Sequence, residues 1–332
     1  MDIGKVPNKL LNKLVLDKFK PSDKRVILGG GVGEDFGVLD LGGDYCVLSS
    51  DPITGSAIHA GRAAVHVACN DIATCGIKPV AILTTLLLPP GASEEELGVI
   101  VDDIAAAAGE LGVSVIGGHT EVTDAVTRVL ISVTAIGAAK MAKYVTTGGA
   151  APGDSIVMTK SAALEGASLL ASEREQELVE HFGKAFVDGV KQLSNEISVV
   201  GEGVIAGEFG VSAMHDVTEG GVLGAVWEMA EAAGKGVAVR KDHIEVRDDV
   251  RRVCGYFDID VYRLISSGSM LIATDKPGDL ITALGRYGVL AREIAMILSD
   301  PQDRYVLDGG KRVMLQPPEP DELYKALKSK NV

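Results

Sequence analysis

Hydrophobic and polar positions follow two patterns along this chain: short apolar runs between turn residues, and longer stretches with helical spacing. From residue 25 to residue 136, runs rich in Val, Ile and Leu are separated by Gly, Pro and Asp. This pattern is typical of strands. We therefore expect strands at Arg25–Leu28, Phe36–Leu39, Tyr45–Ser49, Val80–Leu88, Val113–Ile116 and Arg128–Ile136.

Two helices are predicted among these strands. The segment His59–Cys75 is a helix of small residues, ended by a following glycine. Ser93 and Glu96 have the spacing of a capping box, which starts a helix that runs to about Leu111. The resulting order, β-β-β-α-β-α-β-β, predicts one compact unit that ends near Ala139.

A segment rich in Gly, Ala and Pro, residues 146–154, separates this unit from a second one. The second unit is predicted to contain strands at Ser155–Thr159, Val237–Arg240 and Ser269–Thr274. Helices are predicted at Glu165–His181, from Lys184 to about Gly201, up to Ala233, at Val250–Tyr256 and at Gly278–Tyr287. A chain of 332 residues also exceeds the usual size of a single core, about 250–300 residues. We expect an α/β (α+β) protein with domains at residues 1–145 and 150–332.

Charge is distributed unevenly. Residues 1–25 have seven Lys and Arg against three Asp, whereas the whole chain has a net charge of −14. Leu10, Leu11 and Leu14 fit one face of a short helix that Pro21 ends. One interpretation is an ordinary amphipathic helix with solvated lysines. The other is that Lys5 or a neighbour folds over the phosphates of a nucleotide.

Composition argues against several classes of protein. The acidic balance argues against a nucleic-acid partner, because binding to the phosphate backbone requires dense Lys and Arg. The sequence has no apolar stretch of the roughly 18–20 residues that span a bilayer and no signal-peptide core at its start. The four cysteines lack C-x-x-C spacing, so we expect them to be reduced and buried. A cytoplasmic protein without a membrane partner is the expectation.

Acidic residues recur beside small residues where predicted strands and helices end. Carboxylates gathered in this way repel one another unless a hard cation lies between them, and Mg²⁺ is the usual cation at phosphate sites. Backbone N–H groups of the preceding glycine run, including Gly31 and Gly33, could hold phosphate oxygens. The pattern predicts a metal-dependent nucleotide enzyme. Its motifs are Gly33-Glu34-Asp35, Ser49-Ser50-Asp51-Pro52, Asn70-Asp71-Ile72-Ala73 and Gly117-Gly118-His119-Thr120-Glu121.

The individual acids differ in how strongly they indicate a metal. Asp71 lies in the last turn of a predicted helix, where the helix dipole disfavours a carboxylate, and no lysine lies one turn away. Asp51 ends a strand before a proline, and Asp35 follows glycines; both positions are also common in turns. Glu121 follows a glycine pair that permits close approach to a ligand. We predict Asp35, Asp51, Asp71 and Glu121 as metal ligands. His119 is a candidate general acid or base, or a loop cap.

In this order, the motifs resemble those of the aminoimidazole ribonucleotide synthetase-like superfamily, which has the PurM-type fold. This group includes thiamine-monophosphate kinase, selenophosphate synthetase and the HypE-type hydrogenase maturation factor. The resemblance covers nearly the whole chain, and it is greatest to HypE-like proteins. It is carried by the Asn-Asp-x-small-x-x-Gly-x-x-Pro run at 70–79, the Gly-Gly-x-Thr element at 117–120 and the His-Asp-x-x-x-Gly-Gly element at 215–221.

The resemblance implies a homodimer whose N-terminal strands form a shared β-barrel, and a C-terminal α/β domain. ATP would bind between the barrel and the second domain, with Mg²⁺ bound by Asp35, Asp51 and Asp71. The resemblance also places Gly117, Gly118 and Thr120 in a loop beside the nucleotide. Asp216, Gly220 and Gly221 would form a motif of the second domain. The candidate catalytic residues are His119, Asp216 and Lys5, and the candidate nucleotide-binding residues are Gly31, Gly33, Gly117, Gly118, Thr120, Gly220 and Gly221.

Three departures from the HypE pattern leave the acceptor substrate open. The sequence ends Leu327–Val332, without the terminal cysteine that carries a carbamoyl group in HypE-type factors. It has Ser266-Ser267-Gly268 where HypE-type sequences have Asn-Glu-Gly, and Glu219 where they usually have arginine. Three hypotheses remain: an ATP-dependent enzyme that activates or phosphorylates a small substrate, a kinase similar to thiamine-monophosphate kinase, and a nucleotide-binding scaffold or sensor that binds a protein partner.

Overall fold

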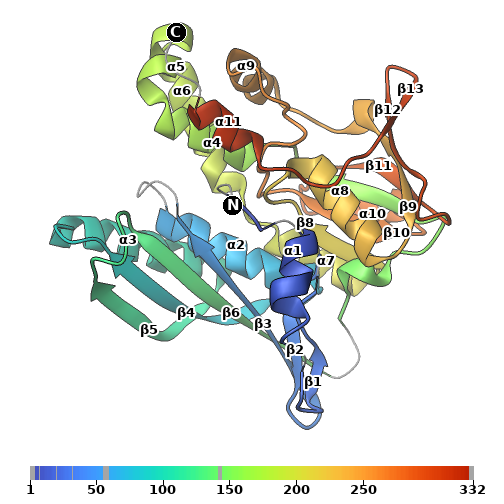
Figure 1. Cartoon of the computed structure of the whole chain (residues 1–332), viewed down its shortest axis with the longest axis horizontal. Coiled ribbons are helices and arrows are strands. Elements are labelled where there is room, and N and C mark those ends of the chain that lie inside the picture. Colours follow the sequence, from blue (N-terminus) through green and yellow to red (C-terminus); the bar gives the residue numbers. More distant parts are fainter. Residues whose placement is uncertain are drawn as a thin grey trace.

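The computed structural model describes residues 4–6, 8–19, 21–31, 33–54, 60–140 and 144–328. The predicted helix start at His59, Val32 of the glycine run and the C-terminal residues 329–332 lie outside them. Two mixed β-sheets, each with its own helices, form the fold (Figure 1). The prediction of a mixed α/β protein is confirmed. The domain boundary near residues 145–150 stays a prediction.

The first sheet has six strands in the order β1-β2-β3-β6-β4-β5. All neighbours pair antiparallel except β4 and β5, which are parallel. Helices α2 and α3 pack together, and α2 covers β3 and β6. The elements are β1 (Val26–Leu28), β2 (Gly37–Asp40), β3 (Asp44–Ile53), α2 (Ala60–Thr74), β4 (Pro79–Leu88), α3 (Glu94–Leu111), β5 (Ser114–Val122) and β6 (Leu130–Lys140).

Alternation of buried and less buried residues shows how this sheet packs. In β6, Ile131, Val133 and Ala135 are buried in the same core cluster as α2, and the residues between them are less buried. All nine residues of the edge strand β5 are exposed. The side of the sheet opposite α2 therefore remains largely uncovered in a single chain, as is common for antiparallel sheets.

The second sheet has seven strands in the order β13-β12-β9-β11-β7-β10-β8. Its central strands are buried on both faces, which explains why they are continuous apolar runs. The strands are β7 (Ser155–Thr159), β8 (Ala213–Asp216), β9 (Gly236–Arg240), β10 (Met270–Thr274), β11 (Ala291–Leu298), β12 (Arg304–Asp308) and β13 (Lys311–Met314).

Helices cover both faces of the second sheet (Figure 1). In β7, Ile156 and Met158 face a cluster that contains α4, α8 and α9, whereas Val157 belongs to the cluster that contains α2, α7 and α10. The helices are α4 (Leu164–Glu173), α5 (Glu175–Phe182), α6 (Lys184–Lys191), α7 (Val200–Phe209), α8 (Gly221–Ala232), α9 (Asp248–Tyr256), α10 (Pro277–Gly285) and α11 (Glu322–Lys328). A short N-terminal helix, α1 (Asn8–Leu11), continues into a π-helical turn.

Glycines allow α2 and α7 to pack closely between the two sheets. A Cβ atom at Gly203 would lie 2.3 Å from the carbonyl oxygen of Ala73, so a larger residue cannot fit there without movement. Asn70 of the Asn-Asp motif joins α2 to the segment just before α7. Its Nδ2 donates to the carbonyl of Ile197 at 2.9 Å, and its Oδ1 accepts from the N–H of Val199 at 2.8 Å. These contacts fix the distance between the sheets. Because Asp71 directly follows Asn70, they also fix the position of Asp71.

Several predicted elements were wrong in extent. The predicted strand Val113–Ile116 extends through the Gly-Gly-His-Thr element to Val122, so that element is a strand and not a loop. The single predicted helix Glu165–His181 is interrupted at Arg174 between α4 and α5. Strands β11 to β13 and helix α11 were not predicted. Among the described helices, none is long and apolar enough to cross a membrane.

Candidate functional site

A cavity of about 560 Å³ lies where the glycine-rich segment, β3, α2 and β8 meet. Among the described residues, eight carboxylate side chains line it, against two basic ones, Lys5 and His215. The carboxylates come from both halves of the chain: Glu34, Asp35, Asp51, Asp71, Glu165, Asp216, Glu219 and Glu228. An excess of this size favours bound cations, since like charges in a buried space repel strongly.

Asp51 and Asp71 reach the cavity from the first sheet and its helix. Asp51 lies on β3, and Asp71 lies in the last turn of α2, as predicted. The hydroxyl of Ser49 donates to Oδ2 of Asp71 at 2.5 Å. Burial raises the pKa of Asp71 well above its ordinary value, and the carboxylates of Asp216, Asp51 and Asp35 act in the same direction. Three of the four predicted metal ligands, Asp35, Asp51 and Asp71, thus share one charged neighbourhood.

Asp35, His215 and Asp216 offer ligand atoms that lie within 4.8 Å of one another. Nδ1 of His215 lies 2.9 Å from Oδ2 of Asp35, and Nε2 lies 3.2 Å from Oε2 of Glu228. Although burial disfavours a charged ring, these two carboxylates raise the pKa of His215 well above its ordinary value. A ring that donates from both nitrogens has no lone pair for a metal. His215 therefore orients Asp35 and Glu228 and is not itself a ligand.

The carboxylate of Asp216 fits a hard cation. Burial raises its pKa to about 7, with Asp35 and Asp51 acting in the same direction and His215 opposing them. Its Oδ2 atom is buried and has no hydrogen-bond partner in the part of the chain that the structure describes. A buried oxygen of this kind is costly unless a ligand satisfies it. Oxygen ligands from several carboxylates are what Mg²⁺ prefers, so Asp35, Asp51, Asp71 and Asp216 form a suitable set. Asp216, predicted as catalytic, belongs to this acid cluster.

Lys5 lies at the same cavity. Its Nζ donates to Oγ1 of Thr218 at 3.2 Å, and its backbone N–H donates to Oε2 of Glu219 at 3.2 Å. Although burial opposes the charged form, the carboxylates of Glu228 and Glu219 raise the pKa of Lys5. The structure therefore supports the interpretation that the N-terminal segment folds over the site.

The predicted nucleotide-binding glycines differ in position. Gly31 and Gly33 line the cavity. Gly33 has φ 79°, and a Cβ atom there would lie 3.3 Å from the carbonyl of Glu228, so glycine permits both the turn and the close approach to α8. Gly220 and Gly221 precede and start α8, but their N–H groups already donate, to Oδ2 of Asp321 at 2.7 Å and to the carbonyl of Thr218 at 3.1 Å. Neither N–H is free for a phosphate.

The Gly-Gly-His-Thr-Glu element does not line the cavity of its own chain. Gly117, Gly118, His119, Thr120 and Glu121 are exposed on the edge strand β5. His119 instead pairs with Glu121, at 2.8 Å from Nε2 to Oε2. A Cβ atom at Gly118 would lie 1.8 Å from the carbonyl oxygen of Thr84, so strand pairing with β4 requires this glycine. Their predicted roles at a nucleotide stay predictions.

Four lining carboxylates were not predicted as site residues from the sequence: Glu34, Glu165, Glu219 and Glu228. Glu34 is directly next to Asp35, but Glu228 lies within the largely apolar helix α8 and Glu165 lies in the first turn of α4. Acids in a first turn are ordinarily explained by the helix dipole. The apolar neighbours of Glu228 in α8 were the one signal that could have identified it, because carboxylates are almost never fully buried unless they are paired.

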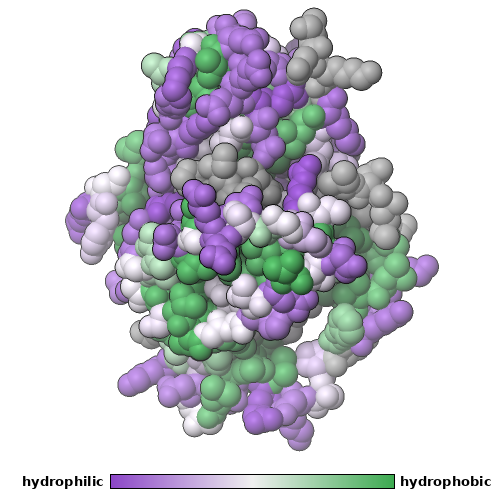
Figure 2. Space-filling view, turned by 90° about the vertical axis from the view of Figure 1, so that its left-hand side faces the viewer, coloured by the Kyte–Doolittle hydropathy of each residue, from purple (hydrophilic) through white to green (hydrophobic). Residues whose placement is uncertain are grey.

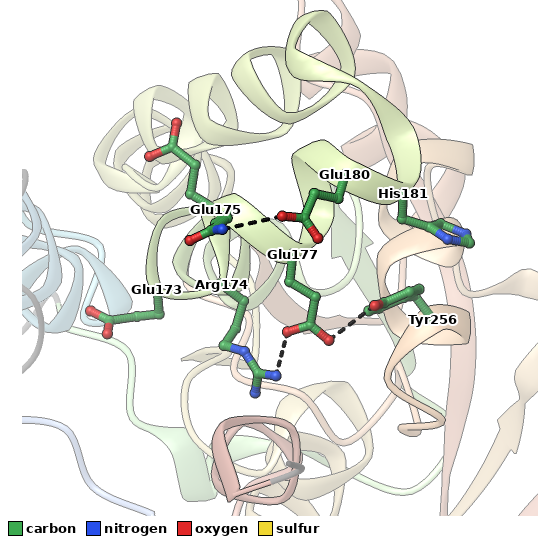
Figure 3. A pocket seen from close by; sticks show the side chains of 8 residues that line it. Glu173, Arg174, Glu175, Glu177, Glu180, His181 and Tyr256 are labelled. Atoms are coloured by element: carbon green, nitrogen blue, oxygen red, sulfur yellow. Dashed lines mark hydrogen bonds and ion pairs between the residues drawn. The ribbon is translucent and has the colours of Figure 1, made fainter. Parts of the chain in front are cut away.

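A second hollow, of about 460 Å³, lies beside α5 (Figure 3). Glu177 points toward Arg174 and Tyr256, with which it forms an ion pair and a hydrogen bond of 3.0 Å. Glu173, Glu175 and Glu180 also line this hollow. Its ion pair and hydrogen bonds join groups of the protein to one another, and none of its acids belongs to the acid cluster. We therefore place the candidate site in the larger cavity.

The chain carries both domains of the AIR synthase related proteins and belongs to this family. Residues 33–139 match its N-terminal domain and residues 151–308 its C-terminal domain. All four aspartates of the acid cluster, Asp35, Asp51, Asp71 and Asp216, fall within the matched segments.

Individual relatives are more distant. A Methanocaldococcus jannaschii protein, provisionally named for hydrogenase expression and formation, is 28% identical over 82% of this chain and 81% of its own length. The carbamoyl dehydratase HypE of Rhizobium leguminosarum bv. viciae is 25% identical over 80% of this chain and 76% of its own. The crystal structure of E. coli HypE, a hydrogenase maturation protein, superposes with a TM-score of 0.75 at 21% identity and covers 96% of this chain and 99% of that chain.

Proposed function

We propose that this protein is an ATP- and Mg²⁺-dependent enzyme that activates or phosphorylates a small acceptor by phosphoryl transfer. The acid cluster carries this proposal, because four carboxylates from both halves of the chain line one cavity and act on one another's charge, and one buried oxygen of Asp216 has no hydrogen-bond partner among the described residues. Without a cation such a cluster is destabilising. A protein that served only as a scaffold would have no need for it.

Two solved structures of the same fold support the binding of a nucleotide. One is HypE in complex with ATP, with a TM-score of 0.68, and the other is the thiamine monophosphate kinase of Aquifex aeolicus in complex with AMPPCP and TMP, with a TM-score of 0.73. In this chain, Asp35, Asp51, Asp71 and Asp216 would hold Mg²⁺. The metal would neutralise the charge that develops on the phosphates during transfer.

The remaining residues would position the reactants. Lys5 would add a positive charge over the phosphates, and the backbone at Gly31 and Gly33 would approach them closely. His215 would keep Asp35 in place through its hydrogen bond of 2.9 Å. These roles are positioning and electrostatic, which is what phosphoryl transfer mainly demands of a protein.

We further infer a homodimer through the first sheet. The edge strand β5 is nine residues long and exposed along its length, and it includes Val115, Ile116 and Val122, which are 47%, 59% and 64% exposed. A long exposed edge with apolar residues is a template for strand pairing. Figure 2 shows apolar atoms among polar ones over the lower half of the face that it draws, whereas the upper half is mainly hydrophilic. A second copy would cover this edge and complete a barrel.

A scaffold or sensor that binds a maturation partner is the second candidate. One observation favours it: a chain in the crystal structure of a HypE–HypF complex has the same fold, with a TM-score of 0.75. The two functions differ in one product, because only the enzyme forms ADP in a metal-dependent reaction.

The test is calorimetric titration of ATP with and without Mg²⁺, together with an ADP assay, on wild type, Asp51→Asn and Asp275→Asn. Asp275 is exposed after β10 and outside the cavity, so its variant is the matched control. We expect Mg²⁺-dependent binding and ADP formation in wild type and the control, and a loss of at least tenfold in affinity in Asp51→Asn. ATP binding that is independent of Mg²⁺ and yields no ADP would favour the scaffold.

A further inference from the structure

The cavity has a second end that the phosphate-binding residues leave unexplained. Glu165, Glu219, Ile265 and Ser267 line it. The charges that act on Glu165 are those of Asp321 and Glu219, and not those of the acid cluster. Glu165 is only 7% exposed, and its donors come from one residue: the side chain of Ser267 and the backbone N–H of Ser267, the latter at 3.3 Å from Oε2. These two donors satisfy only part of a buried carboxylate, which can accept about four hydrogen bonds.

The backbone that precedes Glu165 is strained. Lys160 and Ala163 have φ values of 52° and 60°, in the left-handed region that residues other than glycine avoid. Surrounding contacts hold this conformation. Nζ of Lys160 donates to the carbonyl of Ser198 at 2.5 Å, and the N–H of Ala163 donates to Oγ of Ser266 at 2.7 Å. Strain of this kind, on the order of 1–3 kcal/mol per residue, is concentrated at functional sites.

A glycine next to Glu165 presses the start of α4 against the segment 264–267. A Cβ atom at Gly166 would lie 2.4 Å from Cγ of Leu264 and 2.7 Å from the carbonyl oxygen of Ile265. The N–H of Gly166 also donates to that carbonyl, at 3.1 Å. The position of the Glu165 carboxylate is therefore fixed by packing and hydrogen bonds on both sides of it, as expected for a preorganised functional group.

Charge at this end limits what can bind. Burial raises the pKa of Glu165; the Ser267 hydrogen bond opposes this shift, whereas Asp321 and Glu219 add to it. Lys5 is the basic side chain that reaches this end, and it is already hydrogen-bonded to Thr218. An anionic acceptor would meet more negative than positive charge. An uncharged acceptor with an O–H or N–H group would supply the donor that the carboxylate lacks.

We propose that Glu165 is a catalytic residue on the acceptor side, which binds an uncharged O–H or amide acceptor and removes its proton during transfer. This proposal rests on the proposed function. In the step, the acceptor O–H bond breaks and its proton moves to Glu165, or an amide loses its N–H proton in the same way and reacts through its oxygen. A bond forms from the acceptor oxygen to the γ-phosphorus as the bond to the bridging oxygen breaks, and ADP leaves.

The experiment uses water as the acceptor, so that no substrate has to be known. ATP affinity at saturating Mg²⁺ and the pH profile of ADP formation are measured for wild type, Glu165→Gln, Glu165→Asp and Glu177→Gln. Glu177 lies in the α5 hollow of Figure 3 and serves as the matched control. We expect Glu165→Gln to bind ATP within about twofold of wild type while kcat falls about 100-fold, within the range for loss of a general base. The pH profile of this variant should lack the rise in ADP formation that ionisation of Glu165 causes in wild type.

The conservative variant Glu165→Asp should retain part of kcat and the rise with pH, and Glu177→Gln should match wild type. If folded Glu165→Gln keeps both kcat and pH profile, Glu165 has no such role, while the proposed function stands. Loss of ATP affinity in Glu165→Gln and Glu165→Asp would place the residue on the nucleotide side and also overturn the inference. Wild type that neither binds Mg²⁺–ATP nor forms ADP would overturn both proposals.

Discussion

His215 and Asp216 are neighbours in β8, yet their surroundings give them different states. His215 lies between two carboxylates, at 2.9 and 3.2 Å, and is held as a cation. Asp216 lies among other acids, and its buried Oδ2 has no hydrogen-bond partner among the residues that the structure describes. The histidine stabilises the acids near it, whereas Asp216 is a source of instability unless a cation binds. The metal site is therefore expected to cost stability in the metal-free protein.

The variant Asp216→Asn tests, at the residue scale, whether the metal site costs stability in the metal-free protein. The pKa of Asp216 is about 7 in the folded protein against 3.8 in a model peptide. The folded state therefore binds more protons than the unfolded state between these values, and stability is lost as pH rises through this window. Without metal, the variant should be more stable than wild type at pH 8 by about 1–4 kcal/mol, and the gain should shrink toward pH 4. Denaturant unfolding at both pH values measures it.

The same variant should lose Mg²⁺-dependent ATP binding, so that stability rises while function falls. A variant that is less stable than wild type at pH 8 without metal would contradict the account of the acid cluster. Saturating Mg²⁺ should stabilise wild type more at pH 8 than at pH 5.5, because ionised carboxylates bind the metal.

At the scale of elements, the contact between α2 and α7 keeps the two halves of the acid cluster at a fixed separation. Asp71 lies on α2, and Asp216 lies on β8, in the other sheet. Asn70 joins α2 to the segment before α7 by two buried hydrogen bonds, and Gly203 allows the helices to touch. Any change that separates these helices should weaken metal binding without altering a ligand.

Two alanine substitutions on α7 separate packing from helix propensity. In Gly203→Ala the new Cβ atom would lie 2.3 Å from the Ala73 carbonyl oxygen, whereas Gly201 has no atom within 4 Å of the corresponding position. Gly203→Ala should therefore destabilise the protein by about 1–3 kcal/mol. Gly201→Ala should stabilise it by about 0.5–1 kcal/mol. Thermal unfolding of both variants checks this, and equal effects would refute a tight α2–α7 contact.

Sequence could predict the part of the site that carries local signals. Asp51 ends a strand segment, Asp71 is an acid at the wrong end of a helix, and both proved to line the cavity. The resemblance placed Gly117 and Gly118 in a loop, whereas they lie in β5, where Gly118 is required by the close approach of Thr84. Glu165 could not be predicted, because its role depends on contacts with Ser267, 102 residues further along the chain.

Strands β11 to β13 were missed for a different reason. Met296 and Val313 are exposed, at 46% and 53%, and they interrupt the alternation that marks a strand. Pairing with distant strands, β11 with β7 and β9, holds this part of the sheet together. Long-range pairing of this kind leaves little trace in local sequence. The overall fold class was predictable because the buried central strands are continuous apolar runs.

At the scale of the whole molecule, the first sheet leaves its edge strand uncovered in a single chain. Its nine-residue edge strand β5 is exposed and carries apolar side chains. The second sheet, by contrast, is covered by helices on both faces (Figure 1). This asymmetry is the basis for the proposed homodimer, in which a second copy would cover β5.

Ile116→Lys should weaken that dimer, because a charge would be buried at the strand edge. Leu290→Lys is the matched control, since Leu290 is 76% exposed and precedes β11 of the second sheet. Light scattering after size-exclusion chromatography should give a dimer for wild type and Leu290→Lys, and a dissociation constant at least tenfold higher for Ile116→Lys. A monomeric wild type at micromolar concentration would refute the dimer.

The most direct test of the central claim is crystallographic location of the metal. Crystals grown with Mn²⁺ and a non-hydrolysable ATP analogue would show Mn²⁺ by its anomalous scattering. The account predicts a peak bound by Asp71 from one half of the chain and Asp216 from the other, with nucleotide phosphate oxygens as further ligands. Metal bound only at exposed acids such as Glu121, with the acid cluster free of it in the presence of nucleotide, would contradict the account.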